Sequence, residues 1–387
     1  MSSMPWKVSG VVNERLNFVL RVQQGERVSD LCREYGISRK TAYKFIERHE
    51  RLGAIGLYDE RTRPERTPHR LSPAVEELIV DARKAHPTWG PAKLKAWLSD
   101  RHPGMRLPAT STFGRVLLRR ELILVTRARR ERHAYVATPL TMAHEANAVW
   151  CCDFKGQFRM GNKKYCYPLT VTDLYSRYLL GCEGMDRICG TAVRTAFSAL
   201  FTEYGMPAAI LSDNGTPFSS RAIHGLSRLS VWWLRLGIQH QRITPGHPEQ
   251  NGAHERMHLT LKKETTRPAG ANLLQQQERF DRFRKVFNEE RPHEALGQRP
   301  PATAYASSTR PFPKHLPEPE YPLHDVTIRV RSDGGIYFNG KKTKLTNALA
   351  GELVGLREVG EHRYAVSFMN LDLGTFHLQR NPPKRAR

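Results

Sequence analysis

The feature that most constrains the fold is the order of strand-like and helix-like segments between residues 150 and 264. Three strand-like apolar runs come first, joined by short turns, of which Gly161-Asn162 is the clearest. Helices with apolar spacing then alternate with further strands. This order predicts an α/β domain with a mixed five-stranded sheet. The expected strands are residues 150–158, 164–172, 177–183, 208–212 and 238–243, and the expected helices are 191–204, 226–236, one that carries Glu255, and 273–288.

Three acidic residues stand out in this domain. Asp153 lies in the first apolar strand, and Asp213 follows the apolar run 210–212 directly before a glycine turn. Glu255 lies near the start of a predicted helix, with Lys262 two turns further along the same face. Carboxylate oxygens suit Mg²⁺, and two ions held by such residues can catalyse displacement at phosphorus. We therefore predict that Asp153, Asp213 and Glu255 form a catalytic metal site.

The charge balance points to an anionic partner. The 387 residues include 61 Lys and Arg against 38 Asp and Glu, which gives a formal net charge of +23. Nucleic acid is the leading candidate for such a chain, and an anionic membrane surface is the weaker one. No apolar run approaches the roughly 18 residues of a membrane span, and the first ten residues lack a secretion signal. We expect a cytoplasmic protein.

The six cysteines do not indicate a zinc site, because none of them forms a C-x-x-C pair. Four lie in or beside expected strands, where reduced cysteines pack as small apolar residues. We expect core positions rather than metal ligands.

Residues 1–56 predict a helix-turn-helix DNA-binding domain. Three short helices are expected between residues 11 and 52, with a tight turn at Gly36-Ile37-Ser38 and Ser38 as the cap of the last helix. The second helix of such a pair enters the major groove of DNA. An ordinary helical bundle with a solvated basic face remains the alternative. The residues expected on the outward, DNA-binding face are Arg39, Lys40, Tyr43 and Lys44.

A second helical trio at residues 71–122 predicts a second helix-turn-helix domain, and residues 57–70 read as a linker between the two. A basic connector follows at 123–139. It belongs to an arginine-rich run that is either a solvated charge cluster or a segment that tracks the DNA backbone.

The sequence changes character after residue 306. Residues 307–322 are expected to be a Pro-rich linker, and residues 323–380 contain short alternating strands separated by glycine turns, which predicts a small all-β barrel. Its run Lys341-Lys342-Thr343-Lys344 offers a basic edge. Residues 381–387 form a basic tail.

Residues 140–306 carry motifs that resemble the catalytic core of bacterial insertion-sequence DDE transposases, which is similar to that of retroviral integrases. The resemblance implies a ribonuclease-H-like fold, with two helix-turn-helix domains before it and a small barrel after it. The matching motifs are Trp150-x-x-Asp153-Phe154, Ser212-Asp213-Asn214-Gly215 with Phe218, His247-Pro248, Asn251-Gly252-x-x-Glu255-Arg256-x-His258, Arg291-Pro292-His293 and Pro300-Pro301-Ala302.

The third carboxylate is open to two readings. Glu249 lies 36 positions after Asp213, a spacing common in these proteins, and Glu255 lies 42 positions after it. We choose Glu255, because the family's glutamate lies in the context Asn-Gly-x-x-Glu-Arg inside a helix. Glu249 falls in a Pro-containing loop, where site geometry is harder to hold.

The resemblance also implies the reaction and its partners. Two Mg²⁺ ions, for which Mn²⁺ can substitute, would be held by the three acids. The enzyme would bind terminal inverted repeats, cut at the element ends to free 3′-hydroxyls and join these to target DNA. Both ends must be handled together, so a homodimer or tetramer on DNA is expected, in the bacterial nucleoid. Lys262 and Lys263 would contact DNA near the transferred end.

Two other readings remain open: a catalytically decayed or domesticated sequence-specific DNA-binding protein, and a structure-selective nuclease on the same fold. Among the remaining polar residues, we expect a structural role for Asp173 and an ion pair for Arg256. Packing or DNA contact is expected for His240, His247, His254 and His258, and surface positions for Glu183, Asp186, Glu203 and Glu264.

Overall fold

The computed structural model describes residues 10–59, 71–123, 143–220, 222–244 and 247–378, and of Pro248 and Glu249 only the backbone. Most of the predicted linker, nearly all of the basic connector and the basic tail lie outside these residues. The chain divides into two compact units, Met1–Arg70 and Leu71–Arg387, which are described separately. No described helix is both long and apolar enough to span a membrane.

The first unit is the predicted helical trio. The second and third helices meet at a turn in which Gly36 adopts φ +64°, a conformation that favours glycine. The side chain of Ser38 accepts a hydrogen bond from the backbone N–H of Thr41, so Ser38 caps the third helix as predicted. Phe18 and Ala42 lie in the core of the trio, and Arg39, Lys40, Tyr43 and Lys44 are exposed. The helices are α1 (Val11–Gln23), α2 (Val28–Glu34) and α3 (Arg39–Leu52), followed by the 3-10 turn η1 (Gly53–Leu57).

The second unit begins with the second helical trio, which packs around the fully buried Trp89 and Phe113. Val286 of the central domain joins this apolar cluster. Arg101 also forms an ion pair with Glu290 at 3.2 Å, so the trio is packed onto the domain that follows. The helices are α4 (Pro73–Ala85), α5 (Pro91–Arg101) and α6 (Thr110–Arg119).

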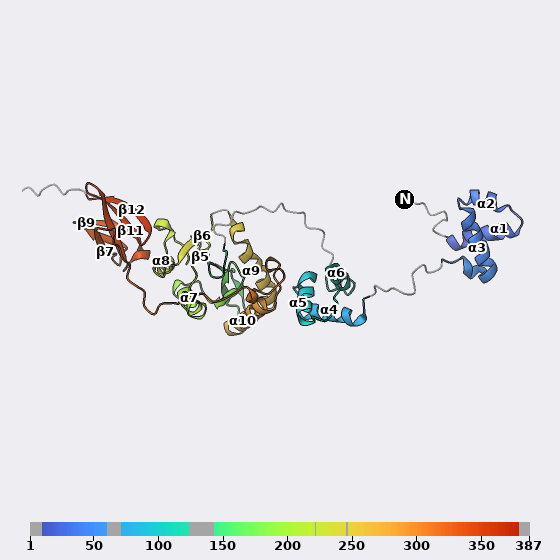
Figure 1. Ribbon diagram of the computed structural model, residues 1–387, viewed down its shortest axis with the longest axis horizontal. Helices are drawn as coiled ribbons and strands as arrows, with labels where there is room; N and C mark the ends of the chain where they lie inside the picture. Colours follow the sequence, from blue (N-terminus) through green and yellow to red (C-terminus); the bar gives the residue numbers. More distant parts are fainter. Residues whose placement is uncertain (1–9, 60–70, 124–142, 221, 245–246, 379–387) are drawn as a thin grey trace, which may run out of the picture. The chain divides into compact units, whose positions relative to one another are not determined.

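The central domain contains the predicted mixed sheet, with its five main strands in the order β4-β3-β1-β5-β6 (Figure 1). β3 is antiparallel to β1 and β4, whereas β1, β5 and β6 run parallel. The first expected strand, 150–158, is in fact two strands, because the chain turns between them at Gly156, whose φ is +84°. The strands are β1 (Val149–Phe154), β2 (Phe158–Arg159), which pairs only with the start of β3, β3 (Tyr165–Asp173), β4 (Leu179–Met185), β5 (Ala209–Ser212) and β6 (Gln239–Arg242).

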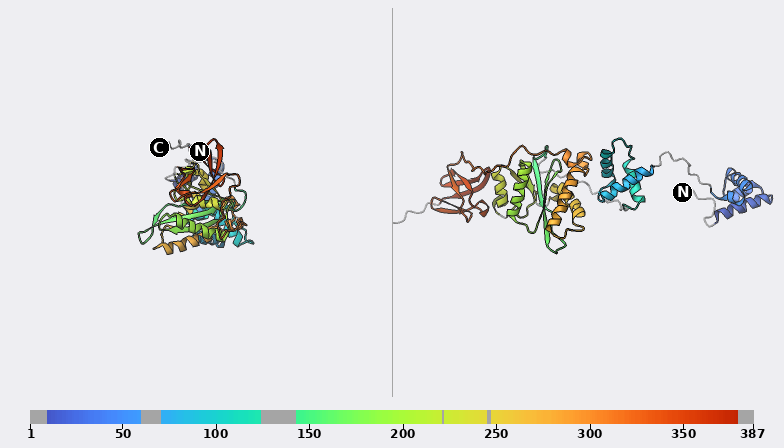
Figure 2. Two further views of the ribbon diagram at one scale, coloured as in Figure 1. Left: turned by 90° about the vertical axis from the view of Figure 1, so that its left-hand side faces the viewer. Right: turned by 90° about the horizontal axis from the view of Figure 1, so that it is seen from below.

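Helices cover both faces of this sheet (Figure 2). On one face, Trp150 and Val171 of the sheet pack with Phe197 and Trp233 of the helices α7 and α8. On the other face, side chains of β3 and β4 pack with those of α9 and α10. The sheet is therefore a rigid platform between two apolar layers. These helices are α7 (Gly190–Tyr204), α8 (Arg228–Arg235), α9 (Gly252–Thr265) and α10 (Leu273–Glu289), and the 3-10 turns are η2 (Ile223–Gly225), η3 (Pro248–Asn251), η4 (Glu294–Leu296) and η5 (Pro301–Thr303).

The segment 307–322, which we predicted to be a linker, is packed against the central domain. Phe312 contacts the rings of Phe201 and Trp232, with centroid separations of 5.7 and 6.2 Å. The Arg310 guanidinium donates to the backbone oxygens of Pro207, Leu236 and Gly237.

The C-terminal strands do not form the barrel that we predicted. β7, β10, β11 and β12 make an open antiparallel sheet in the order β12-β11-β10-β7, while β8 and β9 pair only with each other among the described strands. The hairpin contributes Ile336 to the core under the sheet instead of extending its edge, so the pairing does not close. The elements are β7 (Val326–Arg329), β8 (Gly335–Phe338), β9 (Lys341–Lys344), η6 (Asn347–Leu349), β10 (Leu353–Gly360), β11 (Arg363–Phe368) and β12 (Leu371–His377).

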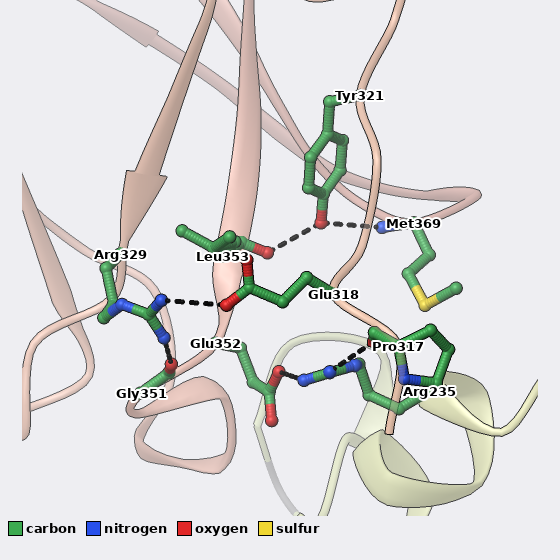
Figure 3. A network of polar contacts seen from close by, with 9 residues as sticks. All are labelled: Arg235, Pro317, Glu318, Tyr321, Arg329, Gly351, Glu352, Leu353 and Met369. Carbon is green, nitrogen blue, oxygen red and sulfur yellow. Dashed lines mark hydrogen bonds and ion pairs between the residues drawn. The ribbon is translucent and has the colours of Figure 1, made fainter. Parts of the chain in front are cut away.

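A polar network joins this sheet to the central domain (Figure 3). Arg235 of α8 forms an ion pair with Glu352 and donates to the Pro317 carbonyl at 2.6 Å. The Tyr321 hydroxyl donates to the Leu353 carbonyl at 2.6 Å. Val231 of α8 also lies in the apolar cluster of the sheet, so the contact has a buried core as well as a polar rim.

Candidate active site

The two strand acids lie at the same edge of the sheet. β1 and β5 are parallel, and Cys152 is opposite Ser212, so Asp153 and Asp213 are the next residues on adjacent strands. The Asp213 carboxylate accepts a hydrogen bond from the backbone N–H of Gly215 at 3.1 Å. A Cβ atom at position 215 would lie 2.9 Å from that carboxylate, so a larger residue here would displace the Asp213 side chain.

The pKa of Asp153 shows that the three predicted acids are electrostatic neighbours. This pKa is raised from 3.8 to about 7, mainly by burial, then by the negative charge of Asp213 and to a smaller extent by that of Glu255. A carboxylate in such surroundings carries unfavourable charge unless a cation lies nearby. The all-oxygen donor set is therefore one that fits a hard divalent cation.

Two buried histidines fix the helix that carries Glu255. The Thr170 hydroxyl of β3 lies 2.7 Å from Nε2 of His254 and 2.6 Å from Nε2 of His258. The Thr172 hydroxyl lies 2.9 Å from Nδ1 of His254. These bonds hold α9 against β3, while Glu255, on another face of α9, is exposed. The sequence signal was available: two histidines one turn apart on the helix, opposite two threonines on one face of a strand.

His258 also lies beside Asp153, with Nδ1 3.8 Å from Oδ2. This contact is not an ion pair, because burial lowers the pKa of His258 to about 2 and keeps the ring neutral. His258 is thus a positioning residue that links the helix to the first strand acid.

Two lysines lie beside the carboxylates, and one of them was missed in the sequence. Burial lowers the pKa of Lys155, the positive charge of Lys262 lowers it further, and the negative charge of Asp153 raises it. Lys155 therefore lies within electrostatic range of both Lys262 and Asp153. Lys262 and Lys263 are exposed on α9. Lys155 lies two residues after Asp153. We expected one strand over residues 150–158 and therefore assigned Lys155 no role in the site.

The acids do not form a ready-made metal cage. Within the described ranges, no three His, Cys, Asp or Glu side chains are gathered tightly enough to hold an ion. The backbone of Glu249 lies in η3, directly before α9, and its side chain is outside the described residues.

Three of the other polar residues are now placed. Asp173 is fully buried and accepts hydrogen bonds from the backbone of Asn147 and from Ser176, which is the structural role that we expected. Glu264 is not the simple surface residue that we expected, because it pairs with Arg291 at 3.1 Å and accepts a hydrogen bond from Thr88. The ion pair expected for Arg256 is wrong: its exposed guanidinium has no partner within the part of the chain that the structure describes.

Family models match both the helical part and the central part of the chain. An integrase core domain matches residues 143–248, and a second integrase core domain model matches residues 236–301. A helix-turn-helix domain matches residues 14–65, and a homeodomain-like domain matches residues 41–117.

Similar proteins include products of insertion elements. An uncharacterized 39.2 kDa protein of insertion element IS476 from Xanthomonas euvesicatoria is 24% identical over 75% of this chain and 83% of its own length. An uncharacterized 31.7 kDa protein of insertion element IS407 from Burkholderia multivorans is 28% identical over 48% of this chain and 65% of its own length. The Gag-Pol polyprotein of baboon endogenous virus is 26% identical over 33% of this chain, which spans only 7% of that polyprotein.

Solved structures similar to the chain include the HTLV-2 integrase catalytic core domain in complex with magnesium. It is 15% identical, with a TM-score of 0.34, and the match covers 43% of this chain and all of that one. A simian T-cell lymphotropic virus intasome is also 15% identical, with a TM-score of 0.37, over 79% of this chain and all of that one. At these scores the likeness alone supports no conclusion about this chain.

Proposed function

Because residues 143–301 form an integrase core domain behind helix-turn-helix domains, and relatives of the chain are insertion-element proteins, we propose that it is a DDE transposase. It binds the terminal inverted repeats of its element, cuts at the ends and joins the freed 3′-hydroxyls to target DNA. The main support for the proposal is that Asp153 and Asp213 lie at the ends of adjacent parallel strands. The negative charge of Glu255 also contributes to the raised pKa of Asp153.

Asp153, Asp213 and Glu255 would hold two Mg²⁺ ions, which Mn²⁺ can replace. When bound, these ions stabilise the charge that develops on the attacking and leaving oxygens of the phosphodiester. Asp153 would be shared between the ions. Lys155 and Lys262 neutralise the phosphates that approach this edge of the sheet. The buried histidines hold α9 against β3, and with it the helix segment that carries Glu255.

The proposal is tested by incubating the full chain with DNA that carries the flanking inverted repeats, in Mg²⁺ and in EDTA. Nicked ends and joined products are expected with Mg²⁺ alone. Repeat binding without either product would indicate a DNA-binding protein with an inactive core. Since both ends must be joined in one event, we propose that two or more copies act together, and the joined products should then sediment with a multimer.

The choice of the third ligand can be tested with a matched pair of variants. Glu255→Gln should lower strand transfer by about a thousandfold, because it removes a ligand charge at the same side-chain volume. Glu249→Gln, six positions earlier in η3, should change the rate by less than about threefold. Both rates are measured on a gel with labelled repeat DNA. The reverse ranking would reassign the ligand to Glu249.

Lys262 is expected to contact a phosphate of the bound DNA. Lys262→Ala should weaken binding by a similar factor on every DNA sequence and reduce the slope of log affinity against log salt by about 1. Fluorescence anisotropy between low and physiological salt gives this slope. Lys285→Ala is the control, because Lys285 is also an exposed helical lysine but lies on α10. An equal loss of slope in both variants would mean that Lys262 contributes only general charge.

A further inference from the structure

A pocket lies on the flank of α9 that faces away from the acidic site. It has a volume of about 590 Å³ and is lined on α9 by Ala253, Arg256 and Thr260, among others. On a helical wheel Ala253 and Thr260 face opposite Glu255 and Lys262, and Arg256 lies about 100° from Glu255. The second helical trio supplies one wall through Lys93 of α5. The pocket is thus separate from the carboxylates and is bounded by two domains of the same unit.

The charges around this pocket are strongly unbalanced. Four cationic side chains from four segments line it, and Glu294 is its only carboxylate among the described residues. Arg291 pairs with Glu264, but the guanidinium groups of Arg177 and Arg256 have no hydrogen-bond or ion-pair partner in the described parts of the chain. The cationic residues are Lys93, Arg177, Arg256 and Arg291.

Two further groups reflect the excess of positive charge around the pocket. Nε2 of His293 is buried without a hydrogen-bond partner among the described residues. Burial, together with the charges of Lys93 and Arg291, lowers the pKa of this ring to about 3, so it is neutral. Burial also lowers the pKa of Lys93 to about 8, and the charge of Arg291 adds to that effect. Gathering cations in a partly enclosed space costs free energy, which a bound anion would offset.

We propose that this pocket binds a phosphate-bearing ligand. Guanidinium groups present paired N–H donors that match phosphate oxygens, and neutral His293 can donate one more hydrogen bond. The volume exceeds that of a single phosphate, so the ligand is a polyphosphate or a stretch of nucleic-acid backbone. Its source is either the DNA bound by the chain or a free polyphosphate. Ligand binding in this pocket does not require DNA cleavage, so it can be tested independently of the transposase reaction.

The test is calorimetric titration of the full chain with tripolyphosphate, in EDTA and at physiological salt. Arg177→Gln and Arg256→Gln should each weaken binding about tenfold, because each removes a charged hydrogen-bond donor. Arg256 has no hydrogen-bond or ion-pair partner within the described chain, so Arg256→Gln should unfold at the temperature of the unaltered protein. The charge of Arg177 acts on the buried Asp173, so Arg177→Gln should unfold at a lower temperature, and its affinity is measured where it is still folded. Arg282→Gln makes the same change at an exposed position of α10, and its affinity should stay within about twofold.

A second titration identifies the source of the phosphate. If prior loading with duplex DNA removes the heat of tripolyphosphate binding, the pocket holds DNA backbone. If the heat persists on the DNA complex, the pocket takes a free polyphosphate. Equal affinities for Arg177→Gln, Arg256→Gln and Arg282→Gln would overturn the proposal, because binding would then reflect only the net charge of the chain.

Discussion

Replacing Asp153 by Asn is expected to lower strand transfer by about a thousandfold or more, while repeat binding persists. If Asp153 is shared between two ions, its loss removes several kcal/mol of charge stabilisation from the reaction. The helix-turn-helix surface is untouched, so repeat binding measured by anisotropy should change by less than about threefold. A variant that kept full strand transfer would exclude Asp153 as a ligand.

The same variant should be more stable than the unaltered protein when no metal is present. The pKa of Asp153 is raised from 3.8 to about 7, so the folded state favours the protonated carboxyl. That stabilising contribution is fully present below about pH 4 and is lost as the pH rises through 7. At pH 8, Asp153→Asn should therefore raise the free energy of unfolding by about 2–4 kcal/mol, and the gain should vanish near pH 4.

Thermal melts in EDTA at both pH values measure this difference. Asp186→Asn is the matched control, because Asp186 is an exposed acid of the same domain and its replacement should have no such pH dependence. If Asp153→Asn were no more stable than the unaltered protein at pH 8, Asp153 would not be held in a repulsive site.

Asp173→Ala is expected to cost about 3–5 kcal/mol of folding free energy without removing a catalytic group. Asp173 is fully buried and accepts hydrogen bonds from the backbone N–H groups of Asn147 and Ser176 at 2.8 and 2.7 Å, and from the Ser176 hydroxyl at 2.6 Å. Alanine leaves these buried donors without an acceptor, at about 1–3 kcal/mol each.

Urea unfolding of the two proteins gives this cost directly. Asp173→Asn keeps one acceptor oxygen, so its free energy of unfolding should lie between those of Asp173→Ala and the unaltered chain. At low temperature, where the variant is folded, its strand transfer per folded molecule should stay near that of the unaltered chain. If Asp173→Ala lowered the free energy of unfolding by less than about 1 kcal/mol, the three hydrogen bonds would contribute little to stability.

The local patterns predicted the central domain well. Apolar runs of strand length, a glycine turn after Asp213 and helical spacing after Gly252 are all local signals, and the corresponding elements are present. Even the neighbouring positions of Asp153 and Asp213 follow from topology, since parallel adjacent strands bring their carboxyl ends to one edge. The exact limits of the domains remain predictions.

The parts that could not be predicted depend on contacts between distant segments. Glu264 has the sequence context of a surface residue, and only Arg291 and Thr88, from elsewhere in the chain, make it structural. The C-terminal barrel was inferred from strand count, but strand pairing decides closure, and the β8–β9 hairpin pairs with itself. Arg256 follows Glu255 in sequence and faces a different flank of α9, where the pocket lies.

The packing of Phe312 affects how this molecule can be dissected. A fragment that ends at residue 306, as the motifs alone would suggest, strips this ring from Phe201 and Trp232 and leaves their apolar surface to water. It also loses Arg310, which satisfies three backbone carbonyls. Such a fragment should self-associate more strongly than one that extends to residue 316, because Leu316 completes the same apolar cluster.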